Sequence, residues 1–266
     1  MLTKTRFTSG GGYPPHPEGV PTGIIQYGRY RVRFASSQEE LDTILRLRYR
    51  IFNLELGEGL ASSEMTGRDE DPFDSCCHHL LVEHEPSHSI IGTYRIQTAA
   101  MAEEGRGFYS AGEFDLAALS PTLVANAIEI GRACISREHR NRQVLFLLWK
   151  GLARYLLAND KRFLFGCCSL NTQDPAEGVR VLRHLERHGH LHESVAIPPQ
   201  PGFECVAPEA PEEDTVDLPA LFKTYLRYGA KVCGAPAIDR EFKTIDFFVL
   251  FDIRAMEERT YRLFFE

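Results

Sequence analysis

Hydrophobic side chains recur along the chain with two periods, one typical of helices and one typical of strands. The apolar stripe of the longest predicted helix, over 143–158, consists of Val144, Leu147, Leu148, Leu152, Tyr155 and Leu156. Ser37, with Glu40 three residues later, forms a capping box that predicts a helix through Phe52. Further helices are predicted over 175–187 and 218–228, and strands over 31–35, 79–83, 90–97, 127–135, 163–168 and 245–251. Alternating strands and crossover helices predict one mixed α/β sheet.

Two segments interrupt this pattern. Residues 9–23 are too rich in glycine and proline for a regular element, so we expect a flexible leader over 1–30 and a single domain over 31–266. Residues 198–217 are rich in proline and acidic side chains and predict a long loop.

Composition narrows the class of protein. The 266 residues are 43% hydrophobic and 25% charged, enough apolar material for a sizeable core, which excludes a disordered tail or a disulfide-stapled miniprotein. The net charge of −7 gives no overall basic footprint, so no nucleic-acid partner is expected. Charged residues interrupt the most apolar segments, 144–157 and 245–253, and the start of the chain has no apolar signal core. We therefore expect a cytoplasmic protein.

Cysteines and histidines give no metal motif. The seven cysteines include two adjacent pairs and no Cys-x-x-Cys spacing, as expected of a reduced protein. Cys167 and Cys168 should point to opposite faces of a strand. His184 and His188 have the spacing of zinc ligands on a helix, but no further motif completes a site, so no metal is expected.

Arg48 lies on the apolar stripe of the first helix, where a cation is costly unless it meets a carboxylate or a ligand. It could also snorkel at the edge of the stripe. The run Arg68–Asp74 holds four carboxylates in seven residues. Such a run is usually a solvated loop, and its functional alternative is a site that holds an amine or fixes Arg48.

The segment Glu129-Ile130-Gly131-Arg132 lies within a predicted strand. On a regular strand Glu129 and Arg132 would point to opposite faces, and Gly131 is a natural place for a β-bulge that changes this register. A bulge leaves a backbone N–H free to stabilise an oxyanion. A surface Glu–Arg pair is the alternative.

Arg140 and Arg142 precede Val144 at the predicted start of the long helix. The N–H groups and positive dipole of a helix N-terminus suit a phosphate, and the two arginines add to the attraction. A basic loop without a ligand is an equal alternative.

Taken in order, these segments resemble the ornithine-lipid acyltransferases (ornithine–acyl-carrier-protein N-acyltransferases, often labelled hemolysin-like) of the GNAT superfamily. The resemblance runs from about residue 35 to the C-terminus and rests on 48–52, 71–74, 78–82, 91–95, 108–110, 113–115, 129–134, 148–151, 165–169, 218–219, 229–234 and 238–242. The pairs Arg48/Phe52, Asp71/Asp74 and Glu129/Arg132 are also similar in spacing to acyl-homoserine-lactone synthases. The resemblance implies a GNAT-like α/β fold with a mixed, mostly antiparallel central sheet flanked by helices.

The resemblance also implies an enzyme that moves a long-chain, or 3-hydroxy, fatty acyl group from a thioester to the α-amine of an amino acid. Ornithine is the expected acceptor, with other amino acids (glycine, tyrosine) or a homoserine-lactone-type signal as alternatives. The implied catalytic residues are Glu129 as general base, His79 as the alternative base and the amide near Gly131 as oxyanion donor. The implied acceptor-binding residues are Arg48, Phe52, Asp71, Asp74, Arg95 and Arg132, with Asp71 and Asp74 attracting a cationic acceptor.

The identity of the acyl donor is inferred from two positions at which this sequence departs from GNAT enzymes that bind coenzyme A. Asn141 and Gln143 stand where GNAT enzymes that bind coenzyme A are expected to have glycines, and their side chains obstruct a phosphate cradle. We therefore expect an acyl-carrier-protein thioester as donor in preference to acyl-CoA, no resident cofactor, and donor binding at Arg140, Arg142 and Val144. Because the product is an amphiphile, we also expect peripheral contact with the inner face of the cytoplasmic membrane.

Overall fold

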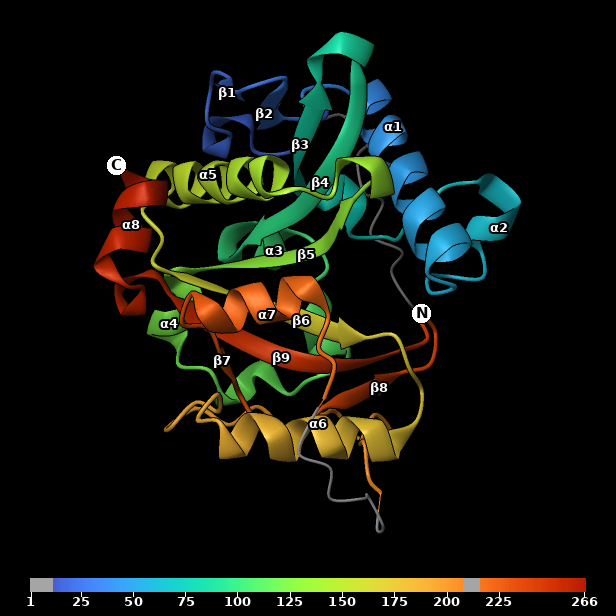
Figure 1. The fold of residues 1–266 in the computed structure, drawn as a ribbon, viewed down its shortest axis with the longest axis vertical. Helices are drawn as coiled ribbons and strands as arrows, with labels where there is room; N and C mark the ends of the chain where they lie inside the picture. The colour runs from blue at the N-terminus through green and yellow to red at the C-terminus, as the bar shows by residue number, and fades with distance from the viewer. Residues whose placement is uncertain (1–11, 208–215) are drawn as a thin grey trace, which may run out of the picture.

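The computed structural model describes residues 12–207 and 216–266, in which nine strands form one sheet (Figure 1). Along the sheet the order is β1 (Ile25–Tyr27), β2 (Tyr30–Phe34), β3 (His78–His84), β4 (Ser89–Thr98), β5 (Ala127–Ile135), β6 (Phe163–Leu170), β9 (Thr244–Asp252) and β7 (Lys231–Val232), with β8 (Ala237–Asp239) also paired to β9. Every pairing is antiparallel except that of β5 with β6. This is the predicted mixed, mostly antiparallel sheet.

The parallel pairing of β5 with β6 covers only a short part of each strand. β5 and β6 pair only from Ala127↔Phe163 to Glu129↔Phe165, although both strands continue beyond this point. Gly166 lies where pairing ends, and a Cβ built there would be 2.2 Å from the carbonyl oxygen of Ile130. Glycine thus lets the two backbones approach closely just before they part. The opening that follows is where a ligand can reach between the strands.

Helices cover both faces of the sheet and its edge. The helix that crosses from β5 to β6 is α5 (Arg142–Ala158), which lies with α7 (Ala220–Arg227) over one face in Figure 1. Its predicted apolar stripe is buried. The other helices are α1 (Gln38–Tyr49), continued by the π-helical turn η2 (Arg50–Glu55), α2 (Ser63–Thr66), α3 (Ala99–Glu104), α4 (Pro121–Ala125), α6 (Pro175–Arg187) and α8 (Glu258–Phe265). Within the described ranges, every helix is too short or too polar to cross a bilayer.

The two sheet faces carry separate cores. On the α5 face, Trp149, Phe247 and Phe251 belong to the largest cluster, which also includes Cys168. On the opposite face, a smaller cluster holds Phe114, Phe165 and Phe248, and Cys167 packs against it. The prediction that the two adjacent cysteines face opposite ways is confirmed. All seven cysteines are free thiols.

The sheet begins earlier than the sequence predicted. A 3-10 turn, η1 (Pro17–Gly19), and β1 lie within the segment expected to be a flexible leader, and β1 pairs with β2. The Tyr13 hydroxyl bonds His79 Nδ1 at 2.8 Å, and the Pro15 carbonyl lies 2.6 Å from His78 Nε2. The expected boundary at residue 31 therefore has to move toward the N-terminus, because residues 12–30 contact the domain. Residues 1–11, and residues 208–215 of the predicted acidic loop, lie outside the described part.

Candidate active site

A β-bulge shapes β5 at the point where β6 leaves it. Thr93 of β4 lies opposite Cys134 and Arg95 lies opposite Gly131, so two residues of β5 face one of β4. The predicted bulge is confirmed, but the residue with left-handed backbone is Arg132, at φ 49°, and not Gly131. Such a conformation costs a non-glycine residue about 1 kcal/mol and is often found at functional sites. It turns Arg132 to the side of Glu129, and both contact the segment Tyr109–Ser110.

Glu129 is buried and held in place by three donors. The amides of Tyr109 and Ser110 donate to its two oxygens at 2.8 Å each, and the Ser110 hydroxyl donates at 2.6 Å. Burial raises the pKa of Glu129, and these hydrogen bonds oppose the shift. A carboxylate has about four acceptor positions, so one is left for a proton from a substrate.

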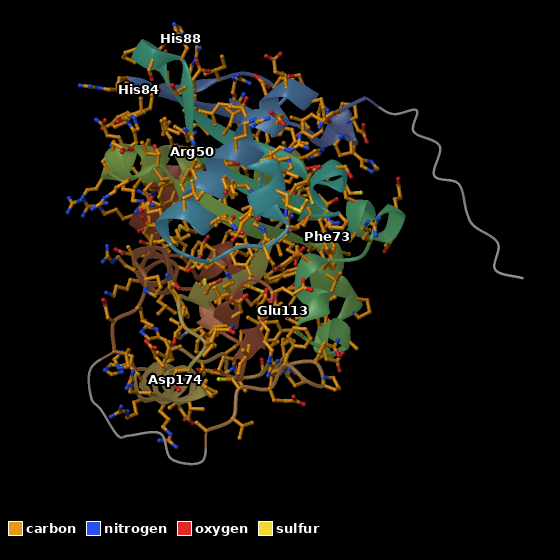
Figure 2. All side chains as sticks on the ribbon, turned by 90° about the vertical axis from the view of Figure 1, so that its right-hand side faces the viewer. Arg50, Phe73, His84, His88, Glu113 and Asp174 are labelled. Atoms are coloured by element: carbon orange, nitrogen blue, oxygen red, sulfur yellow. The ribbon has the colours of Figure 1, made fainter. Side chains whose placement is uncertain are left out.

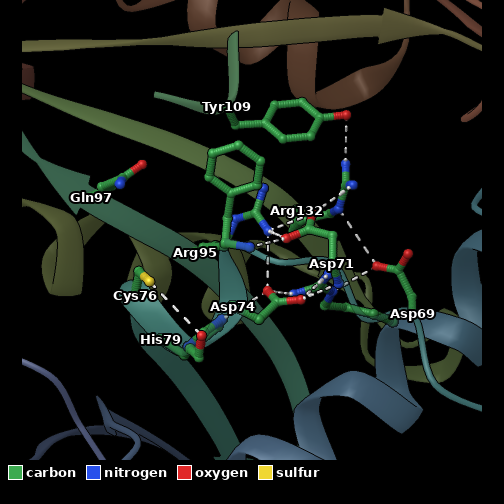
Figure 3. Close-up of polar contacts among 12 residues, drawn as sticks. Asp69, Asp71, Asp74, Cys76, His79, Arg95, Gln97, Tyr109 and Arg132 are labelled. Atoms are coloured by element: carbon green, nitrogen blue, oxygen red, sulfur yellow. Dashed lines mark hydrogen bonds and ion pairs between the residues drawn. The ribbon is translucent and has the colours of Figure 1, made fainter. Parts of the chain in front are cut away.

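Three arginines and three aspartates form a buried ion-pair network behind this strand (Figure 3). Arg48 Nε lies 2.7 Å from Asp69 Oδ2, and Arg48 Nη1 lies 2.5 Å from Asp74 Oδ1. The other pairs are Arg95 with Asp71 at 2.6 Å, Arg95 with Asp74 at 3.1 Å and Arg132 with Asp71 at 3.0 Å. Burial favours a higher pKa for Asp74, but Arg48 and Arg95 hold it well below its usual value.

This network settles two alternatives left by the sequence. Arg48 is fully buried and paired, so it does not snorkel, and it cannot touch an acceptor. Asp71 and Asp74 are already neutralised by arginines. The expectation that they attract a cationic acceptor therefore needs correction, because a second cation would have to displace a buried guanidinium.

His79 is also removed from the candidate bases. Tyr13 and Asp74 occupy its two ring nitrogens, at 2.8 and 3.3 Å. Burial lowers the pKa of His79, although Asp74 opposes the shift. The ring is 1% exposed on the far side of the network and does not line the cavity described next.

A cavity of about 720 Å³ occupies the opening between β5 and β6. The predicted residues Phe52, Arg95, Glu129, Gly131, Arg132, Arg140 and Arg142 line it. Its polar wall faces the Tyr109 side of the sheet, and its apolar wall includes Leu148, Trp149, Phe222, Tyr225 and Phe251 on the α5–α7 side. The cavity therefore joins the two faces through the sheet. Such a passage lets two substrates meet from opposite sides.

The start of α5 forms part of the rim. Arg140 and Arg142 are exposed, and Arg140 Nη1 pairs with Glu55 at 2.5 Å. The Asn141 side chain accepts hydrogen bonds from the amides of Gln143 and Val144, which fills part of the helix N-terminus. Val144 itself lies in the core, so it offers neither a side chain nor a free amide to a donor. The prediction of Val144 as a donor-binding residue is therefore corrected.

Sequence reasoning assigned no role to several buried acidic groups at this site. Burial, with a smaller effect of Asp246, raises the pKa of Glu58 to about 7. Burial also raises the pKa of Glu113 well above its usual value and raises that of Asp246. Figure 2 labels Glu113 at mid-height in the molecule, between Phe73 and Asp174. These residues come from separate elements, so no local spacing could have indicated them.

Comparisons with known proteins show that the chain is similar to acyltransferases. The family model described as Acetyltransferase (GNAT) domain matches residues 47–150. An L-ornithine N(alpha)-acyltransferase of Brucella abortus (strain 2308) is 34% identical over 247 residues, covering 87% of each chain. One from Rhizobium meliloti (strain 1021) is 32% identical over 240 residues, covering 85% of this chain and 81% of the relative.

Two solved structures are more distant. FeeM, an N-acyl amino acid synthase from uncultured soil microbes, has a TM-score of 0.48 at 11% identity, covering 85% of this chain and 92% of its own. The AHL synthase LasI has a TM-score of 0.45 at 13% identity, covering 85% of this chain and 91% of its own.

Proposed function

The chain belongs to the L-ornithine N(alpha)-acyltransferase family, and on that basis we propose that it transfers a fatty acyl group from a thioester to the α-amine of ornithine. It is an acyltransferase with a GNAT fold, and its reaction takes an acyl donor and an amino-acid acceptor. The observation that carries the proposal for this chain is the cavity between β5 and β6. It brings Glu129 and Arg132 to one side of the sheet and a large apolar wall to the other.

The apolar wall supports a fatty acyl chain as the transferred group. Leu148 and Trp149 of α5 and Phe222 and Tyr225 of α7 surround the cavity on that side. Burial of a methylene group is worth about 0.8 kcal/mol, so a long chain binds far more tightly here than acetyl. The acyl chain is long, with or without a 3-hydroxyl group.

Transfer proceeds by attack of the neutral α-amine on the thioester carbonyl carbon. Glu129 accepts the proton that the amine loses, directly or through water, and its raised pKa makes it a stronger base. A backbone N–H near Gly131, next to the bulge, donates to the oxyanion of the tetrahedral intermediate. The C–S bond then breaks, the amide forms, and the leaving thiolate takes up a proton.

Arg132 orients the α-carboxylate of the acceptor. It lines the cavity, and its Nε–H has no hydrogen-bond partner among the described residues, although Asp69 lies 3.6 Å away. Phe242 and Tyr109 hold the guanidinium by cation–π contacts, at 4.3 and 4.7 Å from the ring centroids. Arg95 holds Asp71, which is a partner of Arg132. Arg48 holds Asp74 in the same network.

The donor is an acyl-carrier-protein thioester, with no resident cofactor. Arg140 and Arg142 at the cavity rim bind its phosphopantetheine phosphate or the acidic surface of the carrier protein. The filled cap at Asn141 leaves little room for the longer pyrophosphate of coenzyme A.

Membrane contact is expected beside the cavity rim. Met65 of α2 and Leu54 of η2 expose 92% and 66% of their surface, and Leu56 lines the cavity. These residues can touch the bilayer that receives the amphiphilic product. Flotation with anionic vesicles, comparing the native protein with Met65→Ser, tests this contact.

Product analysis tests the proposed function. The protein is incubated with 3-hydroxyacyl carrier protein or the matching acyl-CoA, and with ornithine, lysine, glycine, tyrosine or S-adenosylmethionine. Mass spectrometry should detect N-acyl ornithine as the main product, formed faster from the carrier protein. Arg142→Ala should raise the KM for the carrier protein roughly tenfold, whereas Arg259→Ala, an exposed control on α8, should not. Absence of any N-acyl amino acid, with folded protein and intact donor, would overturn the proposal.

A further inference from the structure

Two buried carboxyl groups meet beside the cavity without a counter-ion. Glu113 follows the short 3-10 turn η5 (Tyr109–Gly112), and Asp246 lies on β9. Their side-chain oxygens and the sulfur of Cys167 all lie within 4.8 Å of one another. Glu113 is 4% exposed and Asp246 is 3% exposed. Asp246 and Cys167 line the cavity that also holds Glu129.

Glu113 and Asp246 share a hydrogen bond with each other, but among the described residues neither has the arginine partner that other buried acids of this protein have. Glu113 Oε2 and Asp246 Oδ1 form no hydrogen bond with any described residue. Asp69, Asp71 and Asp74, by contrast, each pair with an arginine. Hydrogen bonds with Ser169 and with Glu113 only partly offset the rise in the pKa of Asp246 that burial causes. Burial and the closeness of the two groups raise the pKa of Glu113 well above its usual value, so without a ligand the pair retains a shared proton. A ligand cation bound here would take the place of that proton.

Strand register places Asp246 on the same face as the transfer site, and Glu113 lies beside it. Glu129 lies opposite Phe165 on β6, and Asp246 lies opposite Ser169. Residues at alternate positions of β6, here Phe165, Cys167 and Ser169, share one face. Cys167 is two positions beyond Phe165, about 7 Å along the strand. The carboxylates around Cys167 therefore lie on the same face as Glu129, about two residues further along β6.

We propose that Glu113 and Asp246 bind the side-chain ammonium of the acceptor and so make the enzyme selective for a diamino acid. This rests on the proposed function, and it moves the cation site from Asp71 and Asp74 to a different pair of carboxylates. With the ammonium there, the α-amine lies toward Glu129 and the α-carboxylate toward Arg132. The three groups of ornithine then meet a carboxylate pair, a base and a guanidinium.

An ammonium fits this site better than a metal ion. Burial, and then Glu113, raises the pKa of the Cys167 thiol well above its usual value. A metal ion would have to displace the proton of this thiol on binding, whereas an ammonium needs no deprotonated sulfur. The site also opens into the substrate cavity, where an ammonium can enter and leave with each turnover.

The test compares ornithine with norvaline, which has the same carbon chain and no side-chain amine. The native enzyme, Asp246→Asn and Glu113→Gln are assayed with both acceptors, and Glu241→Gln, which removes an exposed carboxylate, is the control. Either carboxylate variant should lose at least about 30-fold in kcat/KM for ornithine, mostly through KM, because one partner of a buried charge pair is gone. For norvaline, kcat/KM should stay within about threefold.

Several outcomes would contradict this subsite. Equal losses for both acceptors would mean a structural or base role, and an unchanged preference for ornithine would mean that the cation binds elsewhere. A stoichiometric metal ion in the purified protein that Asp246→Asn removes would replace the ammonium by a metal. Calorimetry of ornithine binding to each folded variant gives a readout without turnover. If no amino acid is acylated by the native enzyme, the proposed function fails, whereas unchanged selectivity in the variants refutes only the subsite.

Discussion

At the scale of single residues, electrostatic pairing separates the supporting residues from those that meet substrate. Arg48, Asp69 and Asp74 are buried and form ion pairs with one another. Glu129 and Arg132 lie at the cavity, and each keeps an acceptor or donor position unfilled. Loss of a network residue should therefore affect stability first, and loss of a cavity residue should affect turnover first.

Arg48→Met should destabilise the protein by about 3–5 kcal/mol, because Asp69 and Asp74 would keep buried charges with one cation fewer. Urea unfolding gives the free energy. Arg46→Met on the same helix is the matched control. Its guanidinium is 57% exposed, and its pair with Asp42 should be worth less than about 1 kcal/mol. Equal effects of the two substitutions would refute the importance of the buried network.

Glu129→Gln should lower kcat by about 10²-fold or more, because an amide cannot accept the proton of the amine. It should also abolish the acid limb of the kcat–pH profile, which lies above the usual carboxyl range because burial raises the pKa of Glu129. Glu138→Gln, an exposed neighbour of α5, serves as control. Full activity in a folded Glu129→Gln protein would show that another group is the base.

Glu58 should make stability depend on pH. Its pKa is raised from 4.5 to about 7 by burial and by Asp246, so between these values the folded state binds more protons than the unfolded state. Stability therefore falls as pH rises through this window. Glu58→Gln should stabilise the protein by on the order of 2 kcal/mol at pH 8 and have little effect below pH 4.5. Thermal unfolding across this range measures it, and a pH-independent difference would contradict the assignment.

Some site residues could be predicted from the sequence and some could not. Glu129, Gly131 and Arg132 lie in one short segment, where the need for a bulge follows from alternation along a strand. Asp246 comes close to Cys167 because β9 pairs with β6, and Glu113 joins them from the end of η5. No local pattern contains that contact.

At the scale of elements, the site depends on the separation of β5 from β6. Gly166→Ala would place a methyl group 2.2 Å from the Ile130 carbonyl oxygen, so one strand must move. We expect a loss of about 1–3 kcal/mol in stability, together with reduced turnover, because the cavity walls shift. Gly112→Ala, whose added methyl meets no atom within 4 Å, is the control. Unchanged activity and stability for Gly166→Ala would show that the close approach is not required.

Element prediction succeeded where the apolar pattern was long. Helices α5 and α6 and strand β5 match the predicted ranges within one residue at each end. The strands that were missed, β1, β7 and β8, have only two or three residues. Elements this short are held by their neighbours in the sheet, so their own sequence has no readable period.

At the scale of the whole molecule, the distribution of charge indicates where the donor and the acceptor bind. A net charge of −7 does not favour docking of an acidic carrier protein, so the local arginines at the start of α5 must provide the contact. On the opposite face, the proposed acceptor site consists of the buried carboxyl groups Glu113 and Asp246. The donor is therefore expected to meet positive charge at the rim, and the acceptor negative charge inside the cavity.

The position of the acyl group on the product is a direct test of how the proposed site orients ornithine. The native enzyme is supplied with an acyl donor and ornithine, and tandem mass spectrometry locates the new amide. If Glu113 and Asp246 hold the side-chain ammonium away from Glu129, as proposed, the α-nitrogen is acylated and the side-chain amine stays free. Acylation of the side-chain nitrogen, or no acylated ornithine, would contradict it.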